Sequence, residues 1–253
     1  GEYAFFGQDD FRISPRLTVN LGLRWEYQHL PTPPLPNSSP AVIPYDGRTL
    51  NQATSTLPND KNNFGPRFGF AYDVTGDGKT SFRGGAGIYY GRMMVAQIYN
   101  SMLNTGNPGG AGTVSLAAAT GPVFPNILAN NSVSLAAAGI QFYQPNFQAP
   151  RIYQYDFILE RQIAKNMVVS LSYIGSTGRD LPTFIDMNLT PCIAVSTACP
   201  AGPTLLFNVT GGPYGGQSFT LPQYTRPGGT PAGALTQLQN SVSSEEYGLV
   251  FSG

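Results

Sequence analysis

Residues 17–29, LTVNLGLRWEYQH, alternate apolar and polar side chains, with apolar ones at every odd position from Leu17 to Tyr27. Successive side chains of a β-strand point to opposite faces, so this segment has one apolar face and one polar, charged face. Other segments of bilayer-crossing length repeat the pattern, and short turns alternate with very long loops between them. The combination indicates a section of a transmembrane β-barrel wall.

The strand pattern covers the chain as part of a single barrel domain, residues 1–253. We expect strands over residues 2–14, 17–29, 64–74, 80–91, 151–163, 167–175 and 245–253. Long loops would cover residues 30–63, 92–150 and 176–240, and short turns would join the remaining strands. The predicted fold is therefore all-β, a partial antiparallel barrel wall of about six or seven strands with long extracellular loops.

Composition excludes several other classes of protein. Only 11% of the residues are charged and the formal net charge is zero, against about 25% charged residues in an ordinary soluble domain. This balance gives no electrostatic basis for binding nucleic acid. No apolar run approaches the roughly 18 residues that a membrane-spanning helix requires, so a membrane-spanning form must be a barrel.

The alternation assigns side chains to the two faces of the predicted wall. The charged residues expected on the inner, lumen-facing side are Arg12, Arg24, Glu26, Arg67, Arg83, Asp156 and Glu160. They would either form ion pairs that hold a plug or line a substrate path. The aromatic residues expected to form a girdle at the membrane interface are Tyr3, Trp25, Tyr27, Phe64, Tyr90, Tyr153, Tyr155 and Tyr173.

Candidate reactive residues are few. Cys192 and Cys199 lie close together in a loop with no other ligand type nearby, which favours a small disulfide loop in an oxidising compartment over free thiols. His29 is the single histidine, which argues against a Ser-His-Asp triad or a multi-histidine metal site. We expect no catalytic site, cofactor or metal.

Three hairpins resemble the barrel of TonB-dependent outer-membrane receptors, of the type with an N-terminal carboxypeptidase-regulatory-like domain. They are YAFFGQDDFRISPRLTVNLGLRWEY over residues 3–27, FGPRFGFAYD with SFRGGAGIYY over residues 64–90, and residues 153–173 with GSTGR at 175–179. The resemblance covers the strands and not the long loops. It implies a fragment of a plugged barrel of about 22 strands, with the plug, the TonB-contact segment and the signal peptide outside these residues. No functional residue of the family carries over.

The resemblance implies an outer-membrane receptor or transporter whose extracellular loops capture a ligand before TonB-energised uptake. Its partners would be outer-membrane lipid, the TonB complex through the plug segment, and a ligand that the weakly charged loops suggest is a glycan or a peptide. A non-transporting adhesion or structural barrel is the first alternative, and an upstream plug would distinguish the two. A secreted soluble β-sandwich, a binding protein or lectin-like enzyme, is the second, and it would need no detergent.

Overall fold

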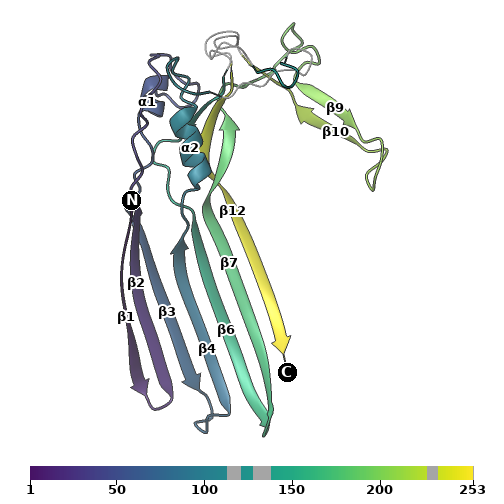
Figure 1. The fold of residues 1–253 in the computed structure, drawn as a ribbon. Coiled ribbons are helices and arrows are strands. Elements are labelled where there is room, and N and C mark those ends of the chain that lie inside the picture. The colour runs from purple at the N-terminus through teal and green to yellow at the C-terminus, as the bar shows by residue number, and fades with distance from the viewer. Residues whose placement is uncertain (113–120, 128–137, 227–232, 253) are drawn as a thin grey trace.

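The computed structural model describes residues 1–112, 121–127, 138–226 and 233–252. Within these residues, eight strands form one sheet in the order β1-β2-β3-β4-β6-β7-β12-β5 (Figure 1). Their bounds are β1 Glu2–Ser14, β2 Leu17–Gln28, β3 Asn63–Asp73, β4 Thr80–Tyr90, β5 Ile140–Tyr143, β6 Arg151–Ala164, β7 Met167–Asp186 and β12 Leu235–Ser252. Neighbouring strands are antiparallel, apart from the parallel pair of β5 and β12.

Two of the expected strands are much longer than the sequence pattern indicated. Strand β7 continues past residue 175 to Asp186, and β12 begins at Leu235 rather than at residue 245, so the expected loop 176–240 is wrong at both ends. Register shifts interrupt the β7–β12 ladder between Asn240 and Ser244, and Asp180 has a positive φ of 55°. Such bulges break the two-residue alternation. The expected end of the last strand, Gly253, lies outside the described residues.

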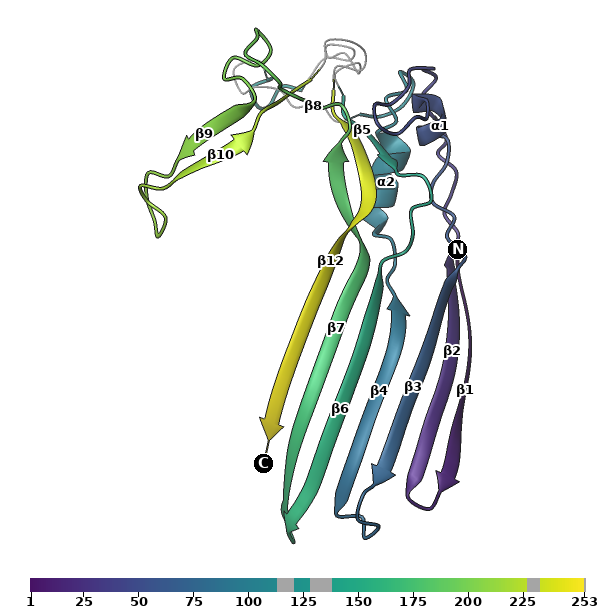
Figure 2. The same cartoon turned by 180° about the vertical axis from the view of Figure 1, so that it is seen from behind.

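The expected loops 30–63 and 92–150 also contain regular structure. Helices α1 (Leu50–Thr54) and α2 (Val95–Leu103) lie beyond the upper ends of β1 to β4, near the edge strand β5 (Figure 2). Thr49 begins α1 with a capping box, in which its Oγ1 accepts from Gln52 N (3.2 Å) and Gln52 Oε1 accepts from Thr49 N (2.9 Å). We call the described loop segments 30–62, 91–112 and 138–150 the cap.

The third loop holds two small ribbons. Strands β9 (Thr204–Asn208) and β10 (Ser218–Pro222) form a hairpin, and β8 (Thr190–Pro191) pairs with β11 (Tyr224–Thr225). Figure 2 shows the β9–β10 hairpin extending sideways, away from the sheet and from α1 and α2.

The hydrophobic core of the described chain lies in the cap and where the cap packs against the first residues of β12, and not in the rest of the wall. One buried cluster consists of Ile43, Leu50, Ala53, Ile140, Phe142, Met187 and Leu235. A second consists of Met93, Ile98, Tyr143, Phe147 and Leu238. Full burial of one such side chain contributes about 1.5–3 kcal/mol, so these clusters hold the cap together.

The wall is a single layer whose large side chains stay exposed in the isolated chain. Phe5 is 69% exposed and Leu249 72% exposed, the opposite of a water-soluble sheet and the condition expected where lipid covers the face. Within the described residues the sheet does not close. Strand β1 pairs only with β2, and β12 after Leu238 pairs only with β7, so each has one free edge. No helix in the described part of the chain is long and apolar enough to cross a membrane.

Aromatic rings fill the space above one glycine of the apolar face. A Cβ added to Gly84 would lie 2.8 Å from Phe70 Cε1 and from Phe157 Cδ1. The rings of Phe82 and Phe157 also stack, with centroids 6.3 Å apart. Position 84 therefore has room only for glycine, because the two rings occupy the space that a Cβ would need.

Candidate ligand site between the cap and the polar face of the sheet

The strand register sorts the predicted residues onto two faces. Residues paired across neighbouring strands share a face, as in the pairs Trp25–Phe64, Ile88–Tyr153 and Phe157–Tyr173. One face, the apolar face, carries all of the expected girdle residues: Tyr3, Trp25, Tyr27, Phe64, Tyr90, Tyr153, Tyr155 and Tyr173. The other, which we call the polar face, carries all of the expected lumen residues: Arg12, Arg24, Glu26, Arg67, Arg83, Asp156 and Glu160.

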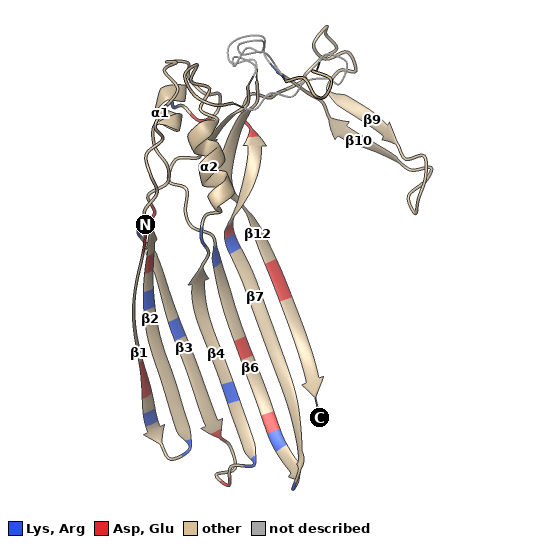
Figure 3. Ribbon diagram, viewed as in Figure 1, with Lys and Arg blue, Asp and Glu red and all other residues tan. Residues whose placement is uncertain are grey.

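The charges of the polar face are spread along the strands and do not form one cluster (Figure 3). Arg24 and Glu26 pair near the cap, with Nε and Oε1 2.6 Å apart. Arg83 and Glu160 pair near the opposite, turn end of the strands. Arg67 places its guanidinium 4.7 Å from the centroid of the Tyr89 ring. Of the expected lumen residues, the structure therefore brings only Arg24 and Glu26 to the cap.

On the apolar face, neighbouring aromatic rings contact each other. Tyr3 stacks on Tyr27 with centroids 6.1 Å apart, and Phe5 on Trp25 with centroids 5.8 Å apart. These rings lie at the cap end of β1 and β2. Tyr173 lies beside Phe157, halfway along β6. A girdle at the membrane interface stays a prediction.

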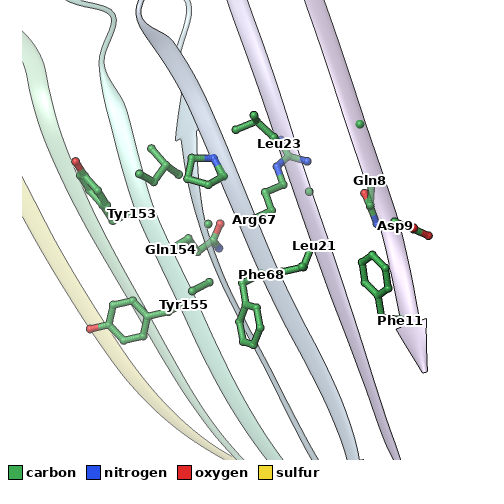
Figure 4. A pocket seen from close by; sticks show the side chains of 16 residues that line it. Gln8, Asp9, Phe11, Leu21, Leu23, Arg67, Phe68, Tyr153, Gln154 and Tyr155 are labelled. Atoms are coloured by element: carbon green, nitrogen blue, oxygen red, sulfur yellow. The ribbon is translucent and has the colours of Figure 1, made fainter. Parts of the chain in front are cut away.

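A hollow with a volume of about 810 Å³ lies on the apolar face (Figure 4). Large side chains such as Phe11, Leu21 and Phe68 surround it, and Gly7 and Ala86 leave room between them. Asp9 also lines this hollow, and the strand register places this charged side chain on the apolar face. A hollow so lined on this face accommodates lipid chains and offers few groups for selective recognition.

A smaller and more polar cavity, of about 270 Å³, lies where the cap meets the polar face. Strands β1 to β3 contribute Glu2, Arg24, Glu26 and Asn63, and the cap contributes Asp60, Arg92, Met93 and Ala149. One hydrogen bond joins the cap to the polar face here, and another joins two segments of the cap. Met93 N donates to Gln28 Oε1 (3.1 Å), and Ala149 N donates to Asp60 Oδ2 (2.7 Å).

Apart from Asp60, the charged groups around this cavity are paired with each other. Besides Arg24 and Glu26, Arg92 Nη2 lies 3.1 Å from Glu2 Oε2. Asn63 is only 4% exposed, and its Oδ1 accepts no hydrogen bond from the described residues. A buried acceptor of this kind is normally matched by a water molecule or a ligand donor.

A second cleft, of about 690 Å³, separates cap residues 56–62 from residues 143–148. Amide side chains dominate its polar lining. The Tyr143 hydroxyl is buried beside it, and burial raises the pKa of that hydroxyl. Trp25 Nε1 donates to Lys61 O (2.7 Å) and Tyr27 Oη donates to Asn59 Oδ1 (2.7 Å), so these cap residues rest on the apolar face.

Hydrogen bonds also join cap segments to each other and to β12. Arg48 Nη2 donates to Tyr143 O (2.6 Å), and Gln237 Nε2 donates to the Asp46 carboxylate. Burial opposes ionisation of Asp46, whose side chain is 0% exposed. The hydrogen bonds and charge of Arg48 outweigh burial and hold the pKa of Asp46 below its ordinary value.

Cys192 and Cys199 form a disulfide in the connection between β8 and β9. The cap residues of the 270 Å³ cavity, Asp60, Arg92 and Met93, were not singled out by the sequence pattern. They lie in segments without alternation, and only the fold brings them to Arg24.

Comparison with known proteins shows the family to which the chain belongs. The family model described as outer membrane beta barrel domain matches residues 1–251. Among solved structures, the siderophore receptor PirA from Pseudomonas aeruginosa is similar, with a TM-score of 0.44 and 11% sequence identity over 98% of this chain. The chain spans 30% of that receptor's length. No curated protein matches the sequence.

Proposed function

Because the chain belongs to the outer membrane β-barrel domain family, and so lies in the bacterial outer membrane, we propose that it forms part of a receptor for TonB-energised ligand uptake. The sheet is a section of an antiparallel transmembrane barrel wall. The observation that carries the proposal is the cavity lined jointly by the cap and the polar face. A ligand bound there lies at the mouth of the lumen, between the exterior and the inner wall.

In the proposed mechanism the cap captures the ligand and the polar face guides it inward. Binding residues are often held on loops above a rigid scaffold, and the cap has that arrangement. Passage would then follow movement of a plug pulled by the TonB complex, which the resemblance of the hairpins implies. Outer-membrane lipid would cover the apolar face. The proposal assigns binding and passage to this chain, and no catalysis.

Charge supports a glycan or a peptide as the ligand. Residues 187–225 contain no Lys, Arg, Asp or Glu, so the β9–β10 hairpin has no charged group for an ionic ligand. The ion pairs of the cavity neutralise themselves. These features favour a ligand that is recognised by hydrogen bonds and apolar contact.

The test uses bacteria that express the complete natural protein, with and without TonB. Fluorescent neutral glycans and peptides would be offered to both strains, and surface binding would be measured separately from accumulation inside the cell. We expect binding in both strains and accumulation only with TonB. Equal accumulation in the two strains would contradict energised uptake.

One observation favours a second function, adhesion without transport. The β9–β10 hairpin extends away from the wall, and Tyr214, Phe207 and Phe219 are 63%, 48% and 47% exposed. Deletion of residues 203–223 separates the two functions. An adhesin would lose cell attachment, whereas a receptor would keep TonB-dependent accumulation. A soluble sandwich has no comparable support, because within the described residues no second sheet packs on the apolar face.

A further inference from the structure

The cavity beneath the cap is nearly balanced in charge. It has two ion pairs. Arg24 pairs with Glu26 within β2, and Arg92 of the cap pairs with Glu2 of β1, so the positive and negative charges of each pair cancel. Asp60 adds one carboxylate, whose Oδ2 already accepts from Ala149 N. An anionic ligand would therefore meet an excess of carboxylates, and a zwitterion would have to separate existing ion pairs. Separating the partly buried Arg24–Glu26 pair would leave one of its charges without a partner, which is unfavourable. The cavity therefore favours a neutral ligand.

The same groups retain hydrogen-bonding capacity after pairing. A carboxylate offers about four lone-pair sites and a guanidinium five N–H donors, and each ion pair uses only part of these. A hydroxyl both donates and accepts, so adjacent hydroxyls can bond to the carboxylate and the guanidinium of one pair. Asn63 also lines the cavity, and its buried carbonyl oxygen has no partner among the described residues. This arrangement suits a polyhydroxylated molecule.

Size and apolar lining limit the ligand further. The cavity volume of about 270 Å³ is just below the range of about 300–1,000 Å³ for drug-sized ligands. Met93 lines the cavity with a side chain only 6% exposed, which gives an apolar surface for the C–H face of a ring. We propose that the cavity binds one sugar unit of a neutral saccharide. The inference rests on the proposed uptake function and names its ligand class.

The first experiment measures binding of single sugar units to the complete receptor. The protein is purified in an amine-oxide detergent, because the head group of a maltoside or glucoside detergent would compete. The probes are the methyl glycosides of glucose, galactose and mannose, with an acetylated and amidated neutral tripeptide as the competing class. Saturation-transfer NMR and calorimetry report binding, and we expect at least one methyl glycoside to bind and the tripeptide not to.

Substitution of one acid places the bound sugar in this cavity. Glu26→Gln keeps the shape of the side chain and removes the charged acceptor, so we expect affinity for that glycoside to fall about tenfold or more. Glu160→Gln is the matched control, because Glu160 pairs with Arg83 on the same face but at the turn end. It should leave the affinity unchanged. Arg92→Gln, at a side chain 79% exposed, tests the cap side without a risk to folding and should weaken binding several-fold.

The outcomes separate this inference from the uptake proposal. Tripeptide binding without glycoside binding, or equal losses in Glu26→Gln and Glu160→Gln, would overturn the saccharide site. So would TonB-dependent uptake by a receptor that binds none of the glycosides. Glycoside binding that depends on Glu26 and Arg92 would support the site even where TonB-dependent accumulation fails.

Discussion

Leu238 tests whether the cap has a packed core of its own. Its side chain is 0% exposed, and it belongs to the cluster of Met93, Ile98, Tyr143 and Phe147. It also lies in the short parallel ladder of β12 and β5, where it pairs with Tyr143. Leu238→Ala therefore removes side-chain volume from the point at which the cap meets the wall.

The expected loss follows from the burial of this leucine. Replacement of a fully buried leucine by alanine costs about 2–5 kcal/mol, because a cavity remains. A loss of about 3 kcal/mol raises the fraction of time that the cap is open about 100-fold. Leu249→Ala is the matched control, because Leu249 lies on the same strand but is 72% exposed on the apolar face. It should not change the cap.

Hydrogen exchange of the complete barrel in detergent measures the opening directly. The reporting amides are those of Gln141, which donates to Asn104 O, and Gln144, which donates to Leu238 O. In Leu238→Ala they should exchange about 100-fold faster, while amides of β2 and β3 keep their protection. Unchanged exchange in Leu238→Ala, or the same acceleration in Leu249→Ala, would refute a separately packed cap.

Three further predictions concern the wall, Asp46 of the cap and the disulfide. Gly84→Ala would place its Cβ 2.8 Å from two phenylalanine ring atoms and should destabilise the barrel by about 1–3 kcal/mol in denaturant unfolding. Gly248→Ala, with nothing within 4 Å, should not, and equal unfolding midpoints would contradict the ring contacts. The pKa of Asp46 is lowered by folding, so its contribution to stability is present above the ordinary pKa of 3.8 and is lost as the pH falls through the lowered pKa. Cap protection factors should therefore fall at acidic pH, and Asp46→Asn should remove that component; an unchanged acid response would argue against it. Cys192 and Cys199 should react with maleimide only after reduction, and labelling of the untreated protein would contradict their pairing.

The wall was largely predictable because its physical signal is local. Strands β1 to β4 and β6 alternate apolar and polar residues along almost their whole length, and their bounds lie within a residue or two of the expected ones. The end of β7 (residues 176–186) and the beginning of β12 (residues 235–244) were not predicted as strands, because bulges between Asn240 and Ser244 interrupt the pattern. The ladder continues there through backbone hydrogen bonds that do not require alternation.

The cap was not predictable, because its order comes from distant contacts. Strand β5 has four residues and becomes a strand only by pairing with Leu235–Leu238. Helix α2 lies in a region that reads as loop, and its buried Ile98 packs against Leu238. Prediction of the candidate site stopped for the same reason at Arg24 and Glu26, which alternate within β2. Asn63 joins them by pairing with Glu26 at the start of β3, and Asp60 and Arg92 join them only through folding of the cap.

The two parts of the molecule are stabilised by different forces, and this bears on how a ligand would pass. The wall has its ladder of backbone hydrogen bonds and exposes Leu and Phe side chains that lipid covers, so its stability depends on the membrane. The cap has buried clusters that do not touch lipid, and it meets the polar face through a few hydrogen bonds such as Met93 N to Gln28 Oε1. The cap is also tied to the wall, because β5 pairs with Leu235–Leu238 of β12 and Leu238 lies in the second cluster. In the proposed receptor, breaking the Met93–Gln28 contact would expose the cavity, while packing against Leu238 would keep the cap attached to β12.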